Sequence, residues 1–188
     1  MLDVLRSGVL DGVTLCVAGD GAAERERAAA LGARVVTLDG ALDDEETVAL
    51  AVGALGPVDV LVVDAASAFA AHSGGMAGLR AAVDEAWIVV RAVANASWIE
   101  REGGGEGGKV VLLAPATDAG EHADAVGAAL ESTARTLSVE WARFGIRTTA
   151  IRPRAGTSAG DRAELVAFLS SRAGDYFSGC AFAPGAVA

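Results

Sequence analysis

Few side chains of this chain have the type and spacing that acid–base catalysis requires. The 188 residues include one tyrosine, Tyr176, and one lysine, Lys109. A neighbouring lysine can lower the pKa of a tyrosine and make it a general acid or base, but only where both side chains share one site. Lys109 opens an apolar run in mid-chain, whereas Tyr176 lies near the C-terminus. We therefore exclude a mechanism that needs a tyrosine and a lysine as neighbours.

The two histidines allow other chemistry, but a structural interpretation is favoured for each. His122 and Asp124 are close enough in sequence to form an acid–base pair, and we favour a surface histidine at a helix start. His72 and Ser73 lie in a glycine-rich loop and have no third member of a catalytic triad. No Cys/His spacing suggests zinc, so we expect no metal site.

Charged residues offer two further candidates. The acidic run Asp43–Glu46 could attract a cation, but acidic residues also favour a helix start, and we predict a capping box there. Arg152 and Arg154 flank Pro153 after a strand-like run and could hold an anion. Exposed arginines are more often solvated charges.

Composition excludes several classes of partner and location. There are 25 acidic and 15 basic residues, a formal charge of −10, so we expect no nucleic-acid partner and no anionic membrane. Cys16 lies in an apolar run, which favours a buried free thiol over a disulfide with Cys180. The N-terminal segment is too polar for a signal peptide, and no apolar run reaches about 18 residues. We expect a cytoplasmic protein.

Short apolar runs alternate with helical patterns along the chain. Runs that are apolar on both faces predict buried parallel strands at Val13–Ala18, Arg34–Leu38, Val58–Val63, Lys109–Ala114 and Arg147–Ile151, with a short last strand near Cys180. Helices are predicted at Ala22–Leu31, 43–55, Leu79–Glu102, Ala123–Phe144 and Gly160–Ser171. This alternation predicts the α/β class: a Rossmann-like, doubly wound three-layer sandwich with a mostly parallel sheet of about six strands. We expect one domain over residues 1–188, with a mobile turn at Gly103–Gly108.

Several segments, in order, resemble the short-chain dehydrogenase/reductase family. Residues 127–153 (GAALESTARTLSVEWARFGIRTTAIRP) are similar to the long catalytic helix of that family, its Gly-Ile-Arg turn and the strand that ends in proline. Ala163–Ser171 and Asp175–Gly179 (DYFSG) are similar to its C-terminal helix and Tyr-x-Thr-Gly turn, and Val58–Val63 to its fourth strand. The resemblance implies a nicotinamide cofactor and reversible oxidation of alcohols to carbonyls.

The catalytic residues of the family do not carry over. Its Tyr-x-x-x-Lys pair falls at Ala123 and Gly127, its serine at Ala114-Pro115, and its asparagine at about Ala82. Thr117 is the nearest hydroxyl to the serine position. We therefore predict no catalytic residue.

The cofactor turn of the family is reduced to Gly19 and Gly21, which remain as a Gly-x-Gly. Asp39, at the end of the second strand, could bind an adenosine ribose, although a turn residue is an equal interpretation. Ala65 falls in the segment that replaces the Asn-Asn-Ala-Gly motif. Asp20 and Glu24 are expected to repel a pyrophosphate, by about 4 kcal/mol for a like-charge contact at about 4 Å. We expect no cofactor, and NAD if any.

Two segments of the family pattern are missing. One is an α-β unit between the first and fourth strands, expected at the sheet edge, since only Arg34–Leu38 is strand-like there; the other is the substrate lid after Pro153. The leading hypothesis is a family member that has lost catalysis and is a structural or regulatory subunit. It would form a homo-oligomer, or a hetero-oligomer with an intact relative, through helices 79–102 and 123–144. These carry Trp87, Trp98 and Trp141, a residue type favoured at interfaces but also in cores. The alternatives are an NAD(P)-dependent oxidoreductase with an atypical or partner-supplied active site, and a non-catalytic NAD-binding sensor.

Overall fold

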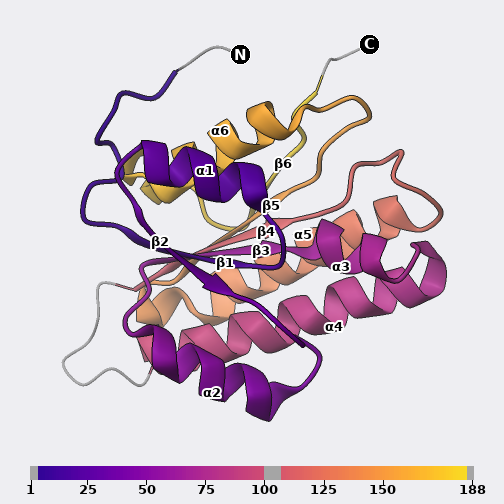
Figure 1. The fold of residues 1–188 in the computed structure, drawn as a ribbon, viewed down its shortest axis with the longest axis horizontal. Helices are drawn as coiled ribbons and strands as arrows, with labels where there is room; N and C mark the ends of the chain where they lie inside the picture. The colour runs from indigo at the N-terminus through magenta and orange to yellow at the C-terminus, as the bar shows by residue number, and fades with distance from the viewer. Residues whose placement is uncertain (1–3, 100–106, 186–188) are drawn as a thin grey trace.

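The computed structural model describes residues 4–99 and 107–185 and contains a six-stranded parallel sheet between two layers of helices (Figure 1). The strand order is β2-β1-β3-β4-β5-β6, and every neighbouring pair is parallel. The strands are β1 Thr14–Ala18, β2 Arg34–Leu38, β3 Val60–Asp64, β4 Lys109–Leu113, β5 Arg147–Ile151 and β6 Cys180–Phe182. The predicted Rossmann-like fold class is confirmed.

The sheet is buried because its central strands are apolar on both faces. All five residues of β3 are buried, as are the last four of β1, β4 and β5. One set of their side chains packs beneath helices α2 (Glu45–Leu55), α3 (Ala65–Ala71), α4 (Gly75–Ala94) and α5 (Ala123–Glu140). The other set packs beneath α1 (Ala22–Ala30) and α6 (Ala159–Ser170), the upper layer in Figure 1. These two hydrophobic clusters are the two halves of the core.

The predicted helix Leu79–Glu102 differs from the observed one at both ends. α4 starts earlier, at Gly75, and a π-helical turn at Asn95–Ile99 follows it. Residues 100–102 lie outside the described residues, as does most of the predicted turn 103–108. With this earlier start, α4 closely follows α3, a helix that the sequence pattern does not predict.

Helix α3 forms directly after β3 because the last strand residue caps it. The Asp64 side chain accepts a hydrogen bond from the Ser67 amide, as an N-cap residue does. A similar cap begins α2: Asp44 accepts from the Thr47 amide at 2.8 Å. The predicted capping box over Asp43–Glu46 is therefore wrong in detail, because the N3 position is a threonine rather than an acidic residue.

Short elements complete the chain. The predicted helix Ala123–Phe144 ends its α-helical part at Glu140 and continues as a 3₁₀ turn, η2 (Ala142–Phe144). A second 3₁₀ turn, η3 (Arg172–Tyr176), leads from α6 to β6. Within the described residues, no helix is long and apolar enough to cross a membrane.

Candidate functional site

The sheet topology places the candidate ligand site at the carboxyl ends of β1 and β3. The strand order reverses there, and in open α/β sheets this switch point is where a crevice for ligands forms. Ala18 pairs with both Leu38 and Val63. Each of these strand residues is followed by a candidate site residue: Gly19, Asp39 or Asp64. The three candidates therefore lie at the same level of the same edge.

The Gly19–Gly21 turn is tight and closely packed against β3 and α3. Gly19 has φ 88°, a left-handed conformation that favours glycine, and a methyl group there would lie 2.6 Å from the Ser67 hydroxyl oxygen. Gly21 has φ 39° and precedes the first turn of α1. The Asp20 amide donates to the Ser67 hydroxyl at 3.4 Å. The chain itself therefore contacts this turn closely, through Ser67 of α3 and Asp64 of β3.

Asp64 occupies the centre of this switch point. One carboxylate oxygen accepts from the Gly21 amide at 3.0 Å, and the other accepts from the Ser67 amide at 3.4 Å. The residue is 6% exposed. Burial raises the pKa of Asp64, while the Gly21 amide and the Arg162 guanidinium oppose that rise. A single carboxylate therefore interacts with the positive ends of both α1 and α3.

Glu24 does not face the Gly-x-Gly turn as expected. It is 1% exposed and accepts a hydrogen bond from Nε of Arg162 on α6 at 2.5 Å. The expectation that Glu24 projects into the phosphate region is therefore wrong, because α6 supplies a partner that buries it. Asp20 is exposed, and its nearest partner is Arg25 at 3.7 Å.

The two other predicted cofactor residues lie at the same edge in different surroundings. Asp39 is exposed and accepts from the Thr37 hydroxyl at 2.9 Å, an arrangement that a strand-end turn residue would have. Ala65 is 2% exposed and is the first residue of α3, directly after Asp64. The sheet therefore brings Gly19, Gly21, Asp39 and Ala65 to one edge.

The four positions aligned with catalytic residues are all small and buried. Ala82, Ala114 and Ala123 belong to one hydrophobic cluster and are at most 1% exposed. Gly127 on α5 is also buried. Ala114 follows β4, Ala82 is in α4 and Ala123 begins α5, so the fold brings these elements together without a polar side chain at those positions.

Phe69 of α3 is a large side chain in the same half of the core. It is 1% exposed and belongs to the same hydrophobic cluster. A methyl group at Gly74 would lie 3.2 Å from its ring, and one at Gly78 would lie 2.7 Å from its backbone oxygen. Gly120, in the loop before α5, is also near the ring, since a methyl group there would lie 4.0 Å from it. The hydrophobic pattern carries no signal for this packing, because it does not predict α3.

Arg152, after β5, lies over Gly127. A methyl group at Gly127 would lie 2.9 Å from Nε of Arg152, so the guanidinium side chain uses the space that a larger residue would need. Arg152 donates to Asp124 at 2.8 Å and also pairs with Glu131. These hydrogen bonds raise the pKa of Arg152. Of the two interpretations offered for Arg152, an anion site or a solvated charge, the structure shows neither, because two carboxylates of α5 already bind this side chain.

The remaining candidate groups are not assembled into a catalytic set. His122 lies 3.6 Å from Glu121, while Asp124 is paired with Arg152, so no His122–Asp124 pair forms. Nδ1 of His72 lies 3.0 Å from the backbone oxygen of Ala68. The Thr117 hydroxyl accepts from the Ala155 amide at 3.2 Å and so links two loops. Among the described residues, no group of three or more His, Cys, Asp or Glu side chains could hold a metal ion.

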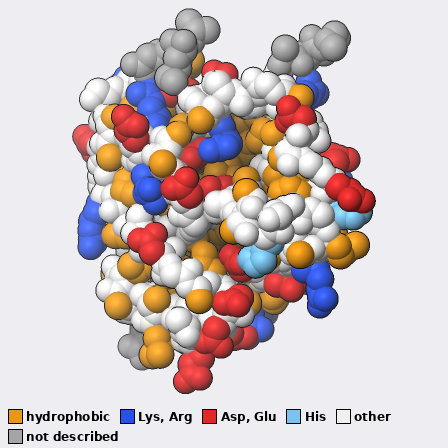
Figure 2. Space-filling view, turned by 45° about the vertical axis from the view of Figure 1, so that its right-hand side comes forward, with side chains coloured by type: hydrophobic (Ala, Val, Ile, Leu, Met, Phe, Trp, Pro, Cys, Tyr) orange, Lys and Arg blue, Asp and Glu red, His pale blue; other side chains and the backbone are white. Residues whose placement is uncertain are grey.

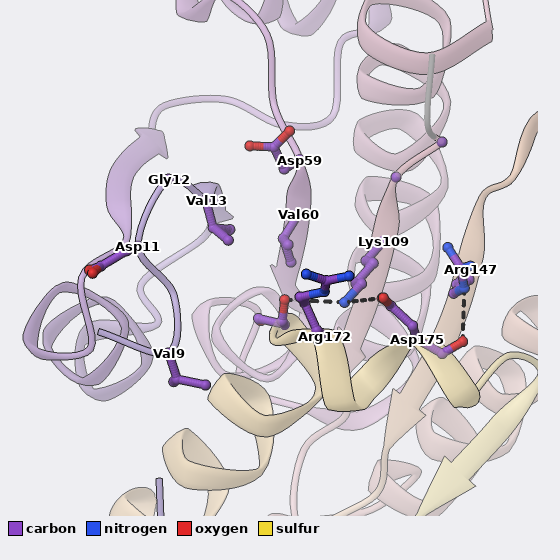
Figure 3. Close-up of a pocket in the computed structure, with 13 residues that line it drawn as sticks. Val9, Asp11, Gly12, Val13, Asp59, Val60, Lys109, Arg147, Arg172 and Asp175 are labelled. Atoms are coloured by element: carbon purple, nitrogen blue, oxygen red, sulfur yellow. Dashed lines mark hydrogen bonds and ion pairs between the residues drawn. The ribbon is translucent and has the colours of Figure 1, made fainter. Parts of the chain in front are cut away.

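A cleft of about 530 Å³ lies at the opposite edge of the sheet, where the strands begin (Figure 3). Its only lysine is Lys109, whose Nζ contacts Asp175 Oδ1 at 2.6 Å and the backbone oxygens of Ser170 at 3.2 Å and Ser171 at 2.5 Å. Burial lowers the pKa of Lys109, and Asp175 opposes this. Nε of Arg147 donates to the Asp175 backbone oxygen at 2.9 Å. The chain's only lysine therefore ties β4 to the end of α6.

Figure 2 brings the right-hand side of Figure 1 forward, the side on which the strands end. Hydrophobic side chains line a shallow hollow on this face, and acidic side chains are scattered over the rest of it. This distribution agrees with the formal charge of −10.

The fold is shared with many solved oxidoreductase structures. No family model and no curated protein matches the chain. In structure it is similar to BdcA (YjgI) from E. coli, with a TM-score of 0.75 and 20% identity over 94% of this chain and 100% of that one. It is also similar to the citronellol catabolism dehydrogenase AtuB of Pseudomonas aeruginosa PAO1, with a TM-score of 0.74 and 22% identity over 96% of each chain.

The enoyl-[acyl-carrier-protein] reductase (NADH) of Aquifex aeolicus gives a TM-score of 0.73 and 18% identity over 94% of this chain and 96% of that one. The chain therefore has the fold of the short-chain dehydrogenases and reductases. At these identities the likeness concerns the fold alone.

Proposed function

We propose that this chain keeps the fold of the short-chain dehydrogenases and reductases without their catalysis, and is a structural or regulatory subunit of an oligomer. The observation that carries the proposal is the burial of Ala82, Ala114, Ala123 and Gly127 in small-residue packing. Proton transfer to a carbonyl needs an ionisable group within hydrogen-bond reach. None of these four positions can supply one.

The residues at the switch point do not fit a nicotinamide dinucleotide. In this type of fold the pyrophosphate lies at the N-terminus of the first helix. Here the Gly21 amide donates to Asp64, so a pyrophosphate would approach a buried carboxylate and also Asp20. Like charges about 4 Å apart repel by about 4 kcal/mol near a surface. Arg152 and its two acidic partners take the space beside Gly127.

Helices α4 and α5 support the subunit role, because both expose a face that suits helix packing. The outward residues of α5 include Ala125, Ala128 and Ser132, which allow close approach of another helix. Trp87 of α4 is 42% exposed. Trp98 is instead 3% exposed and donates to the Val58 backbone oxygen at 2.7 Å, so it is a core residue. Trp141 is half-buried against the core.

A nucleotide-binding sensor is the second candidate, and one observation favours it. Among the described residues, no side chain caps the first turn of α1, which leaves its amides beyond Gly21 without a side-chain acceptor. These amides could still bind an anion if Asp64 were protonated or displaced. An oxidoreductase would in addition need a general acid from another chain.

Isothermal calorimetry with NAD, NADH and NADPH separates these functions when the mass of the same sample is measured by light scattering. For the subunit we expect no saturable heat at millimolar ligand and a mass above that of one 18.8 kDa chain. Saturable NAD binding without turnover would support the sensor. Consumption of NADH with a carbonyl substrate would contradict the loss of catalysis.

A further inference from the structure

Strand β2 ends the sheet on one side, and Figure 1 shows it in front of the other strands, with α1 above it and α2 below. It pairs with β1, where the Arg34 amide donates to the Val13 backbone oxygen at 2.8 Å. Backbone groups alternate in direction along a strand, so those of Val35 and Thr37 point away from β1. Among the described residues, none hydrogen-bonds to these backbone groups, which we call the open side of β2.

The two outermost strands differ in how well they resist the addition of another strand. At the far end of the sheet, β6 has three residues and is followed two positions later by Pro184, and both features hinder pairing. β2 has five residues with no proline or lysine, and its middle three, Val35–Thr37, are all β-branched. The open side of β2 is therefore suited to pairing with a further strand.

The two ends of β2 carry opposite charges. Arg34 is its first residue and Asp39 directly follows its last, and both are exposed. Within residues 4–99 and 107–185, the Arg34 side chain forms no ion pair, and the one partner of the Asp39 carboxylate is the Thr37 hydroxyl. A strand with a positive start and a negative end is complementary to a reversed copy of itself.

A reversed copy of β2 fits the open side in one register. Across a twofold axis level with Val36, Val35 faces Thr37 of the second copy, and the two strands exchange four backbone hydrogen bonds. A shift by one residue would set the open groups of one strand against groups that already bind β1 in the other. The fitting register also brings Arg34 beside Asp39 of the second copy, and this contact occurs twice.

We propose that the partner in the oligomer is a second copy of this chain, which pairs antiparallel through β2 so that the two six-stranded sheets become continuous. This inference rests on the proposed subunit function and gives it an interface separate from the exposed faces of α4 and α5. The backbone groups supply affinity, as they do wherever a strand is added to a sheet. The end charges select the antiparallel direction and favour a second copy over an unrelated extended segment.

Proline at position 37 tests the backbone pairing. Thr37→Pro removes an amide hydrogen of the open side, and an outer strand tolerates proline there. Thr37→Val is the matched control, because both substitutions remove the hydroxyl that binds Asp39 and only proline removes the amide hydrogen. The dissociation constant of the dimer is measured by sedimentation velocity over a concentration series. We expect a dimer weaker by about tenfold or more for proline and by less than about threefold for valine.

Charge exchange tests whether the occupant is a second copy. Arg34→Glu and Asp39→Lys each set like charges together at both ends of the pairing, and each should weaken the dimer by about fivefold or more. An equimolar mixture of the two variants, and the double variant, restore opposite charges and should restore the dimer. Asp118→Lys, in the exposed loop before α5, makes the same change in net charge and should not weaken it. These variants leave the backbone intact, so they remain decisive if Thr37→Pro does not fold.

The outcomes distinguish this inference from the function beneath it. A dimer that Thr37→Pro and the charge variants leave intact overturns pairing through β2 but not the subunit role, because another surface then holds the dimer. Weakening that the mixture fails to reverse overturns the antiparallel register. A monomeric wild type overturns the second copy as partner. Turnover of NADH by a dimer that follows the expected pattern would support the pairing and contradict the proposed function.

Discussion

At the two edges of the parallel sheet, side chains of opposite charge bind the backbone groups at the helix ends. At the carboxyl edge, the carboxylate of Asp64 accepts hydrogen bonds from the amides at the starts of α1 and α3. At the amino edge, the ammonium group of Lys109 binds the backbone oxygens at the end of α6. Each charge has the sign that the helix dipole favours at that end.

The comparison shows that the charged residues at both edges bind partners within the chain. A ligand site needs polar groups whose partners are missing in the free protein. At the switch point the carboxylates of Asp64 and Glu24 already have partners within the chain, and the four positions aligned with catalytic residues carry no polar side chain. The amino edge retains a polar cleft, but its lysine is also held within the chain. Substitutions at the two edges, and at the centre of the sheet between them, test whether these residues stabilise the fold rather than bind a ligand.

The largest effect is expected at the carboxyl edge, for Phe69→Ala. The ring is 1% exposed and packs near Gly74, Gly78 and Gly120, so its removal leaves a cavity beside these glycines. We expect the free energy of unfolding to fall by about 4 kcal/mol, measured by urea denaturation. Leu50→Ala on α2, where the side chain is 73% exposed, is the control and should change it by less than about 0.5 kcal/mol. Similar losses for both variants would mean that Phe69 does not fill this edge.

The strands and most helices could be predicted from the sequence, because apolar runs and helical periodicity are local signals. Helix α3 was missed because its seven residues follow β3 without a turn and show no repeating pattern. Its N-cap, Asp64, is also the last residue of a strand, so the carboxylate gives no separate signal.

The pairing of charges at the candidate site could not be predicted, because the partners are distant in sequence. Glu24 is buried by Arg162, which is 138 residues away, and Arg152 is held by Asp124, which is 28 residues away. The inference about positions 82, 114, 123 and 127 is of a different kind, because the sequence states directly that these residues are small. That inference needed residue identity alone, whereas the charges needed their three-dimensional neighbours.

The second prediction concerns the amino edge. Lys109→Met removes the ammonium group that donates hydrogen bonds to two backbone oxygens and pairs with Asp175. We therefore expect the free energy of unfolding to fall by about 2 kcal/mol. Arg172→Met is the matched control, since Arg172 borders the same cleft and is exposed. It should change stability by less than about 0.5 kcal/mol. Equal effects would indicate that Lys109 is not a structural tie and would make the cleft a candidate binding site.

The third prediction uses the centre of the sheet, between the two edges. Burial, with a smaller effect of Asp39, raises the pKa of the Cys16 thiol from 9.0 to about 12. The folded state therefore keeps a proton that the unfolded chain loses, so this stability is present below about pH 9 and is lost as the pH rises towards 12. Between pH 8 and pH 10 the loss is about 1.4 kcal/mol.

Urea denaturation at both pH values measures this loss. Cys16→Ala should lack that part of the pH dependence, whatever its effect on stability at pH 8. Cys180→Ala, at a half-buried site in β6, should retain it. If Cys16→Ala and the wild type lose the same free energy over this range, the thiol is not buried as the structure describes.

The remaining prediction concerns Asp64→Asn, which asks whether one carboxylate excludes an anion from the carboxyl edge. Asparagine keeps an oxygen that can accept from the Gly21 amide but removes a buried negative charge. Inorganic pyrophosphate, titrated by calorimetry at low ionic strength, should bind the variant with a millimolar dissociation constant, at least about ten times more tightly than it binds the wild type. Asp20→Asn, an exposed carboxylate of the same turn, should change the affinity less.

Stability gives a second, independent readout of the same substitution. Because burial raises the pKa of Asp64 in the folded state, ionising this carboxyl destabilises the wild type as the pH rises through that pKa. The variant lacks this titration, so its stability relative to the wild type should increase as the pH rises from acid to neutral. Equal pyrophosphate affinity in the variant and the wild type, together with the expected pH dependence, would mean that Asp64 is buried as described but is not what excludes the anion. The closed packing of Gly19 against Ser67 would then be the remaining cause.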